Sequence, residues 1–293
     1  MFLRCSALFG PPRARFAPST RSTLDGDVLA DRIMPFTLSH AAAALPLRRV
    51  LRGGAVFPML VIGCFIPDIP YFLPEPLYRI NAHQLPGMLV FGIPCGWTIF
   101  ALWRYLLVEP AAALLPRAYA LLLLDGTSQR AFSAWWGTVS LLAGAVSHVV
   151  WDEFTHRRGL VVHFWPVLAR PVWHVDGAAV PPYLLFQHGS TVLGILCLGF
   201  HVRHRLREVL AERSIAGSSP QLSVNGKLAV AILLAITVVG IVWRTFSAAD
   251  APRFSAYNFV CCCISAAALA TVVYALAWHG CRRLLNDRSR KSR

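Results

Sequence analysis

Long apolar runs separated by short arginine-containing segments dominate the pattern of this chain. Runs of roughly 20 apolar residues are long enough to cross a bilayer as helices. The pattern predicts an all-α fold, a polytopic transmembrane helical bundle with about six spans. A short N-terminal half-helix, capped by Ser39 and ending near Arg48 and Arg49, is expected before them. The expected spans are 56–73, 85–105, 132–151, 182–200, 228–242 and 259–278.

Prolines modify two of these runs. Pro67 lies in the second half of the first span, where the missing backbone N–H should break the helix. Pro110 and Pro116 interrupt the apolar stretch that continues to Leu124, which favours an interfacial hairpin over a further crossing.

The same pattern divides the chain into five segments. The first is rich in Pro, Ser, Ala and Arg, lacks the long apolar core of a cleaved signal, and contains aspartates that argue against a transit peptide. The segments are a disordered extension (1–33), a membrane-embedded core with a metal site (34–205), a cytoplasmic linker (206–226), two additional transmembrane helices (227–281) and a basic tail (282–293).

Composition and charge support a membrane protein. Hydrophobic residues make up 56% of the chain and charged residues 14%, whereas a soluble domain has about 45–50% and about 25%. The net charge of +14 would suggest a nucleic-acid partner in a soluble protein. Here the arginines lie between apolar runs and at both ends of the chain. This distribution is typical of arginines that set membrane topology or contact anionic lipid. We therefore expect membrane lipid, and no nucleic acid, as a partner.

The arginine distribution also predicts the sidedness of the protein. If Arg48, Arg49 and Arg52 are cytoplasmic, the positive-inside rule holds for most loops, with Arg157 and Arg158 as the exception. The expected location is a cell membrane that the chain crosses several times, with the C-terminus in the cytoplasm. The loops 104–130 and 203–213 then lie inside, and the loops 74–82, 152–182 and 245–257 lie outside.

The stretch SHVVWDEFTH carries the most chemistry. His148, Asp152 and His156 recur every fourth residue and so form one stripe on a helix. Imidazole and carboxylate without thiolate suit Zn²⁺, Mn²⁺ or Fe²⁺, and none of the eight cysteines forms a CxxC pair. His148 and His156 are roughly 12 Å apart on a straight helix, too far for one ion unless the helix unwinds near Thr155. Either two neighbours share an ion, or two ions lie about 3.5–4 Å apart with Asp152 between them.

Other polar residues are expected on the same side. The predicted topology brings Asp68, His83, the stripe and His188 to the outer face. An aspartate inside a span is costly unless it is paired or bound to metal, although Asp68 could also cap a helix. For His40, both a hydrogen-bonded structural role and a ligand role are open. Arg157 and Arg158 could contact a phosphate or anchor the loop to lipid.

Four strings together resemble a known family. MPFTLSHAAAALPL, VIGCFIPDIPYFL, SHVVWDEFTHRRG and LLFQHGS are similar to bacterial membrane proteins of domain-of-unknown-function family 4184, over roughly Met34 to His204. That family in turn resembles proteins described as membrane-bound metal-dependent hydrolases and, more remotely, zinc phospholipase C. Ala82 and Gln84 depart from the threonine and serine that flank the matching histidine in those hydrolases. The resemblance implies a metal site of His40, Asp68, His83, His148, Asp152 and His156.

These observations leave three hypotheses. The first is a membrane-bound metal-dependent hydrolase that uses metal-activated water on a phosphoester or lipid-like substrate at the outer face. Its cofactor would be a divalent metal, with zinc expected and manganese or iron as alternatives, and His148 and Asp152 are its candidate catalytic residues. The second is a non-catalytic structural or assembly protein. The third, an ion-coupled transporter, is less favoured because the last two spans carry no central charge and no inverted repeat is visible.

Overall fold

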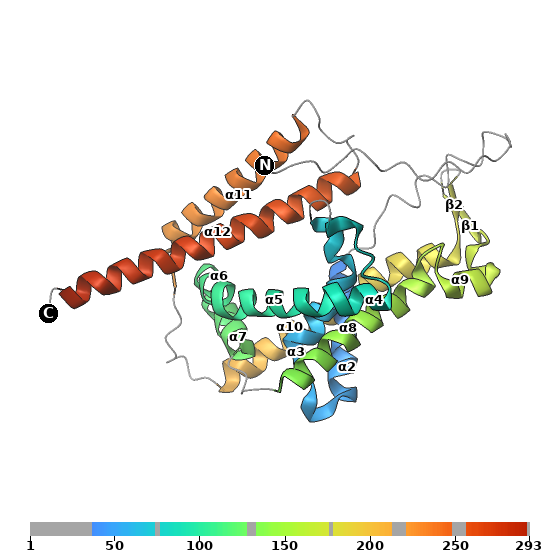
Figure 1. Ribbon diagram of the computed structural model, residues 1–293, viewed down its shortest axis with the longest axis horizontal. Coiled ribbons are helices and arrows are strands. Elements are labelled where there is room, and N and C mark those ends of the chain that lie inside the picture. The colour runs from blue at the N-terminus through green and yellow to red at the C-terminus, as the bar shows by residue number, and fades with distance from the viewer. Residues whose placement is uncertain are drawn as a thin grey trace.

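The computed structural model describes residues 37–73, 77–127, 133–175, 178–212, 221–247 and 256–291. Most of these residues are helical, which confirms the all-α prediction (Figure 1). Within these ranges the strands are β1 (Trp173–Val175) and β2 (Ala178–Val180), which pair antiparallel in a small hairpin. The expected N-terminal extension, residues 1–33, lies outside the described residues.

Four helices are long and apolar enough to cross a membrane. A fifth, α8 (Ala134–Thr155), has 22 residues and would measure about 33 Å, but it is less apolar. The first expected span consists of two short pieces, so the structure supports four of the six predicted crossings by length and composition. The four helices are Leu85–Leu114, Pro182–Ala211, Val224–Phe246 and Asn258–Leu284.

The first expected span is broken, as its prolines predict. The helix α3 (Phe57–Gly63) ends before Pro67, and the chain continues as the 3₁₀ helix η3 (Ile66–Phe72). Pro67 lies in the first turn of η3, where its backbone N–H is not needed, whereas Pro70 lies inside the helix and removes one donor. Before α3 the chain forms η1 (Thr37–Ala43), α2 (Ala44–Val50) and η2 (Arg52–Gly54).

The core forms where α3 lies along α8. The backbone N–H of Val56 donates to Ser140 Oγ at 3.0 Å, near the beginning of this contact. The Cys64 carbonyl oxygen lies 2.7 Å from His148 Nδ1, two turns farther along α8. The two segments therefore run parallel. The helix α10 (Pro182–Glu212) packs against α8 and η1, and its Ser190 Oγ accepts a hydrogen bond from Trp151 Nε1 at 3.1 Å.

The second expected span is one continuous helical rod, Leu85–Leu114. It passes through α4 (Leu85–Gly87), the π-turn η5 (Met88–Gly92), α5 (Ile93–Leu102), the π-turn η6 (Trp103–Leu107) and α6 (Val108–Leu114). We expected Pro110 to interrupt it, but the rod accommodates Pro110 just after a π-turn and ends at Leu114. The chain then turns back into α7 (Arg117–Thr127), which packs on α6.

The last helix is tied to this rod and to η3. After α11 (Val224–Phe246), α12 (Ala256–Lys291) packs on α11 and crosses η6, α6 and η3 (Figure 1). His279 Nε2 donates to the Leu106 carbonyl at 3.0 Å, the acceptor that Pro110 leaves without its N–H partner. The Tyr274 hydroxyl donates to the Pro110 carbonyl at 3.2 Å.

The remaining short elements lie between these helices. They are η4 (Leu77–Arg79), α9 (Leu160–Phe164) and η7 (Pro166–Ala169). Figure 1 shows α9 and the β-hairpin beyond the end of α8.

The His279→Leu variant tests whether α12 stabilises the rod. The substitution leaves the Leu106 carbonyl without its partner, which should cost about 1–3 kcal/mol and lower the thermal unfolding midpoint of the full chain in detergent. Thr271→Val is the matched control on the same helix, because the Thr271 hydroxyl bonds only to Ala267 of its own helix. Equal midpoints for both variants would show that the His279 contact contributes nothing.

Candidate metal centre

Five polar side chains from four separate segments meet at one end of α8. Asp152 is the centre of the cluster. Its Oδ2 lies 3.2 Å from His148 Nε2 and 3.6 Å from His83 Nε2. Its Oδ1 lies 3.7 Å from His40 Nε2. The two oxygens of one carboxylate therefore face histidines from η1, from α8 and from the turn before α4.

Asp68 completes the cluster from η3. Its Oδ1 lies 3.5 Å from His83 Nε2 and 3.5 Å from His148 Nε2. Two groups of three residues each offer one ligand atom per residue, with all three atoms within 4.8 Å of one another. The groups share His148: they are His40, His148 and Asp152, and Asp68, His83 and His148.

Burial makes this cluster unusual for the interior of a protein. The exposed fraction is 1% for His148, 6% for Asp68 and 7% for His40. His148 Nε2 and Asp152 Oδ1 are buried atoms without a hydrogen-bond partner. Buried polar atoms normally have partners, and each exception needs an explanation. Two such atoms within one nitrogen and oxygen donor set fit a divalent cation.

The orientation of His148 follows from a contact with a backbone carbonyl. His148 Nδ1 lies 2.7 Å from the Cys64 oxygen. Because a carbonyl only accepts, Nδ1 must carry the proton, and in the neutral ring the Nε2 lone pair then points into the cluster. Histidine ligands of metals are commonly held in this way, through a second-nitrogen hydrogen bond to a carbonyl or carboxylate.

Two glycines allow that contact. A Cβ atom on Gly144 would lie 2.3 Å from the Leu60 carbonyl oxygen, and one on Gly63 would lie 2.2 Å from the Leu141 carbonyl oxygen. The backbones of α3 and α8 therefore approach one another without intervening side chains. This approach brings the Cys64 carbonyl, one residue after Gly63, against His148, one turn after Gly144.

Local turns position the other ligand candidates. The Asn81 side-chain oxygen accepts a hydrogen bond from the His83 backbone N–H at 3.2 Å, as in an Asx turn. The ring of His40 stacks on that of His148, with 4.0 Å between their centroids. Burial opposes the charged form of His83, but the carboxylates of Asp152 and Asp68 outweigh it and raise the pKa of His83 to about 9.

His156 and His188 are not among the five side chains of the cluster. The helix ends at Thr155, and His156 has extended backbone geometry, so the unwinding that a shared site requires is present. His156 Nδ1 lies 3.5 Å from Asp152 Oδ1 with 40% of the side chain exposed, outside both three-residue groups. His188 is exposed and belongs to neither group, whereas its neighbour Gln187 is 4% exposed.

The residues that support the cluster leave no side-chain motif in the sequence. Gly63, Cys64 and Gly144 act through their backbones, which no side-chain motif reveals. Tyr71 was also missed: its ring centroid lies 5.9 Å from that of His83. Residues three apart share a face of a 3₁₀ helix, so Tyr71 follows Asp68 on η3. The three-residue spacing of Asp68 and Tyr71 in IPDIPY indicates a shared face only if this segment is known to be a 3₁₀ helix.

Comparisons with known proteins assign the chain to one family model. The model, described as Domain of unknown function (DUF4184), matches residues 34–276. We expected the resemblance to end near His204, but the match continues through α11 and most of α12, so these helices are part of the family's common region. No curated protein and no solved structure matches the chain.

The close approach of the two helices can be tested with Gly144→Ala. The new methyl group would overlap the Leu60 carbonyl, so α3 must move away, and we expect a loss of about 2–4 kcal/mol. Gly199→Ala is the matched control, because nothing lies within 4 Å of a Cβ atom at that helical position. The control should be neutral or stabilising by up to about 1 kcal/mol. Similar thermal unfolding midpoints for the two variants would contradict a tight contact.

A second test uses the pKa of His83. The pKa is raised from 6.5 to about 9 in the folded protein, so the stability gained from protonated His83 is complete below pH 6.5 and is lost as pH rises through about 9. In chelator-treated protein, wild type should unfold at a higher temperature than His83→Gln at pH 6.5. This difference should shrink towards pH 10. A difference that is constant over this range would show that His83 is not charged in the cluster.

Proposed function

The chain belongs to the family described as Domain of unknown function (DUF4184), and we propose that it is a membrane-bound metal-dependent hydrolase. The proposed substrate is a phosphoester or lipid-like molecule at the outer membrane face. One observation carries the proposal: a buried nitrogen and oxygen donor set contains two polar atoms that have no hydrogen-bond partner.

The donor set indicates which cation the centre would take. Imidazole nitrogens and carboxylate oxygens without a thiolate favour zinc, with manganese or iron as alternatives. The ligands would be drawn from His40, Asp68, His83, His148 and Asp152. One imidazole nitrogen has one lone pair, so His148 would serve one cation. The two Asp152 oxygens face different histidines, so His40 and Asp152 would remain as the residues to hold a second cation.

The cation would supply Lewis acidity, which polarises a phosphoryl oxygen and lowers the pKa of a water molecule. The protein's own residues prepare the site for this chemistry. The Cys64 carbonyl holds the His148 Nδ1 proton and so maintains the ring tautomer. His156, partly exposed and in contact with Asp152 Oδ1, is placed to exchange a proton between this carboxylate and water.

The two ends of the bundle support the proposed orientation. Asp152 and Ser190 mark the end with the cluster. At the far end of α10, Arg205 pairs with Asp125 of α7 at 3.1 Å. Arg48 also lies away from the cluster, over the Phe57 ring at 5.5 Å. We place this arginine-containing end in the cytoplasm of a bacterium, which puts the cluster at the outer face of the cytoplasmic membrane and the C-terminus inside.

Metal content and hydrolysis test the proposal together. Elemental analysis of the purified full chain should find about one or two zinc, manganese or iron ions per protein molecule. His148→Ala and Asp152→Ala should lose this metal and reduce hydrolysis of bis(4-nitrophenyl) phosphate by more than about 100-fold. His188→Ala removes an exposed histidine outside the cluster and should change neither quantity.

Two results would overturn the hydrolase proposal. If wild-type protein contained no transition metal, the cluster would serve only as a set of contacts between helices. Metal that survives both His148→Ala and Asp152→Ala would place the ion elsewhere in the chain.

A further inference from the structure

Four aromatic rings form a row that leads from the interior of the cluster to its surface. The His40 and His148 rings stack with 4.0 Å between their centroids. His83 follows, with its ring centroid 5.5 Å from that of His148, and Tyr71 follows His83 at 5.9 Å. Exposure increases outward from His148, which is 1% exposed, through the His83 side chain at 26% to Tyr71 at 41%. The Tyr71 ring is therefore the outermost of the four.

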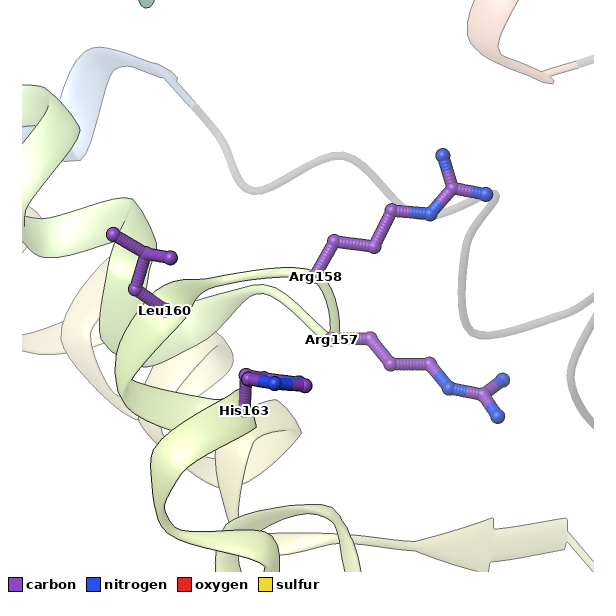
Figure 2. Close-up of a pocket in the computed structure, with 4 residues that line it drawn as sticks. All are labelled: Arg157, Arg158, Leu160 and His163. Carbon is purple, nitrogen blue, oxygen red and sulfur yellow. The ribbon is translucent and has the colours of Figure 1, made fainter.

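A ligand can approach the cluster only at its exposed edges. One edge is formed by His83 and Tyr71, and another by His156, whose side chain is 40% exposed. An open cavity of about 440 Å³ begins at the residue after His156 and is lined by Arg157, Arg158, Leu160 and His163 (Figure 2). A substrate that is larger than its phosphate group therefore has room beside the cluster.

The backbone around Tyr71 is held from two sides. Within η3, the backbone N–H of Leu73 donates to the Pro70 carbonyl at 3.1 Å. From α12, the Ser265 hydroxyl donates to the Phe72 carbonyl at 3.0 Å. These bonds involve the residues immediately before and after Tyr71. Its ring is therefore carried at a defined position beside the cluster.

The charges of the cluster act on the Tyr71 hydroxyl, because Asp68 and Asp152 both interact with it electrostatically. A phenol hydroxyl is protonated at neutral pH and donates one hydrogen bond. Phosphoester hydrolysis spreads negative charge over the phosphoryl oxygens, and donors positioned at such oxygens lower the barrier. A donor here would also offset the repulsion between the two carboxylates and an anionic phosphoryl group.

We propose that Tyr71 contacts the substrate of this centre, and that its hydroxyl donates a hydrogen bond to a non-bridging phosphoryl oxygen. The inference rests on the proposed function and deepens it by adding a residue outside both three-residue groups. The hydrogen bond strengthens as negative charge develops on the oxygen, so its loss should affect kcat more than KM.

The Tyr71→Phe variant tests this contact, because it removes the hydroxyl and keeps the ring beside His83. In the metal-containing full chain, the variant should keep the metal content and the thermal unfolding midpoint of wild type. It should lower kcat for bis(4-nitrophenyl) phosphate by about 100-fold, with little change in KM. Tyr119→Phe is the matched control: Tyr119 is 45% exposed but belongs to α7, and its variant should keep the kcat of wild type.

Binding of orthovanadate, an analogue of the five-coordinate phosphoryl transition state, gives a readout apart from activity. In isothermal titration calorimetry of the metal-containing chain, Tyr71→Phe should bind orthovanadate roughly tenfold more weakly than wild type does. Its affinity for inorganic phosphate should change less, and Tyr119→Phe should bind both as wild type does. Wild-type kcat and orthovanadate affinity in Tyr71→Phe would overturn the inference, as would an equal loss in the control. Loss of metal from Tyr71→Phe would also overturn it, because the hydroxyl would then support the cluster itself.

The wild-type protein separates this inference from the hydrolase proposal. Wild type that contains no metal and hydrolyses no phosphodiester would refute both. Wild type that contains metal and is active, but loses nothing on Tyr71→Phe, would refute the role of Tyr71 alone. A loss of kcat confined to phosphodiesters with poor leaving groups would place the hydroxyl at the leaving oxygen and refute the non-bridging contact.

Discussion

The cluster depends on one helix–helix contact. Because Gly63 and Gly144 have no side chains, the backbones of α3 and α8 approach closely, and the Cys64 carbonyl reaches His148 Nδ1. That hydrogen bond leaves His148 Nε2 facing Asp68 and Asp152. A side chain at either glycine would separate the helices, and the separation would release the histidine, both carboxylate contacts and the ring stacked on it.

Prolines produce irregular helices at two places in the fold. The proline-containing η3 replaces a regular helix and brings Asp68 to the end of α8. Pro110 has no N–H to donate to the Leu106 carbonyl of the rod, and His279 of α12 donates to this carbonyl instead. Ser265 of the same helix donates to the Phe72 carbonyl, at the end of η3, at 3.0 Å. The last helix therefore supports both the rod and the cluster-bearing segment, in keeping with the family match that includes most of it.

Different side chains lie on the two sides of the turn that follows α8. Before it, α8 ends in buried imidazoles and carboxylates with unpartnered atoms. After it, Arg157, Arg158, Phe164 and Trp165 are exposed. Glu153 joins the two sides by accepting the Leu160 N–H.

The sequence by itself determined the helical class and the spacing of His148 and Asp152, because apolar runs and a four-residue repeat are local properties of a helix. It also placed the proline break near Asp68 correctly. Only the tertiary structure decided which residues meet: His40, Asp68 and His83 reach Asp152 through turns and a 3₁₀ helix, His156 stays at the exposed rim, and His188 turns outward while Gln187 is buried. Those outcomes depend on where α8 ends and on how closely two glycines let helices approach. Backbone contacts of this kind leave no side-chain pattern in the sequence.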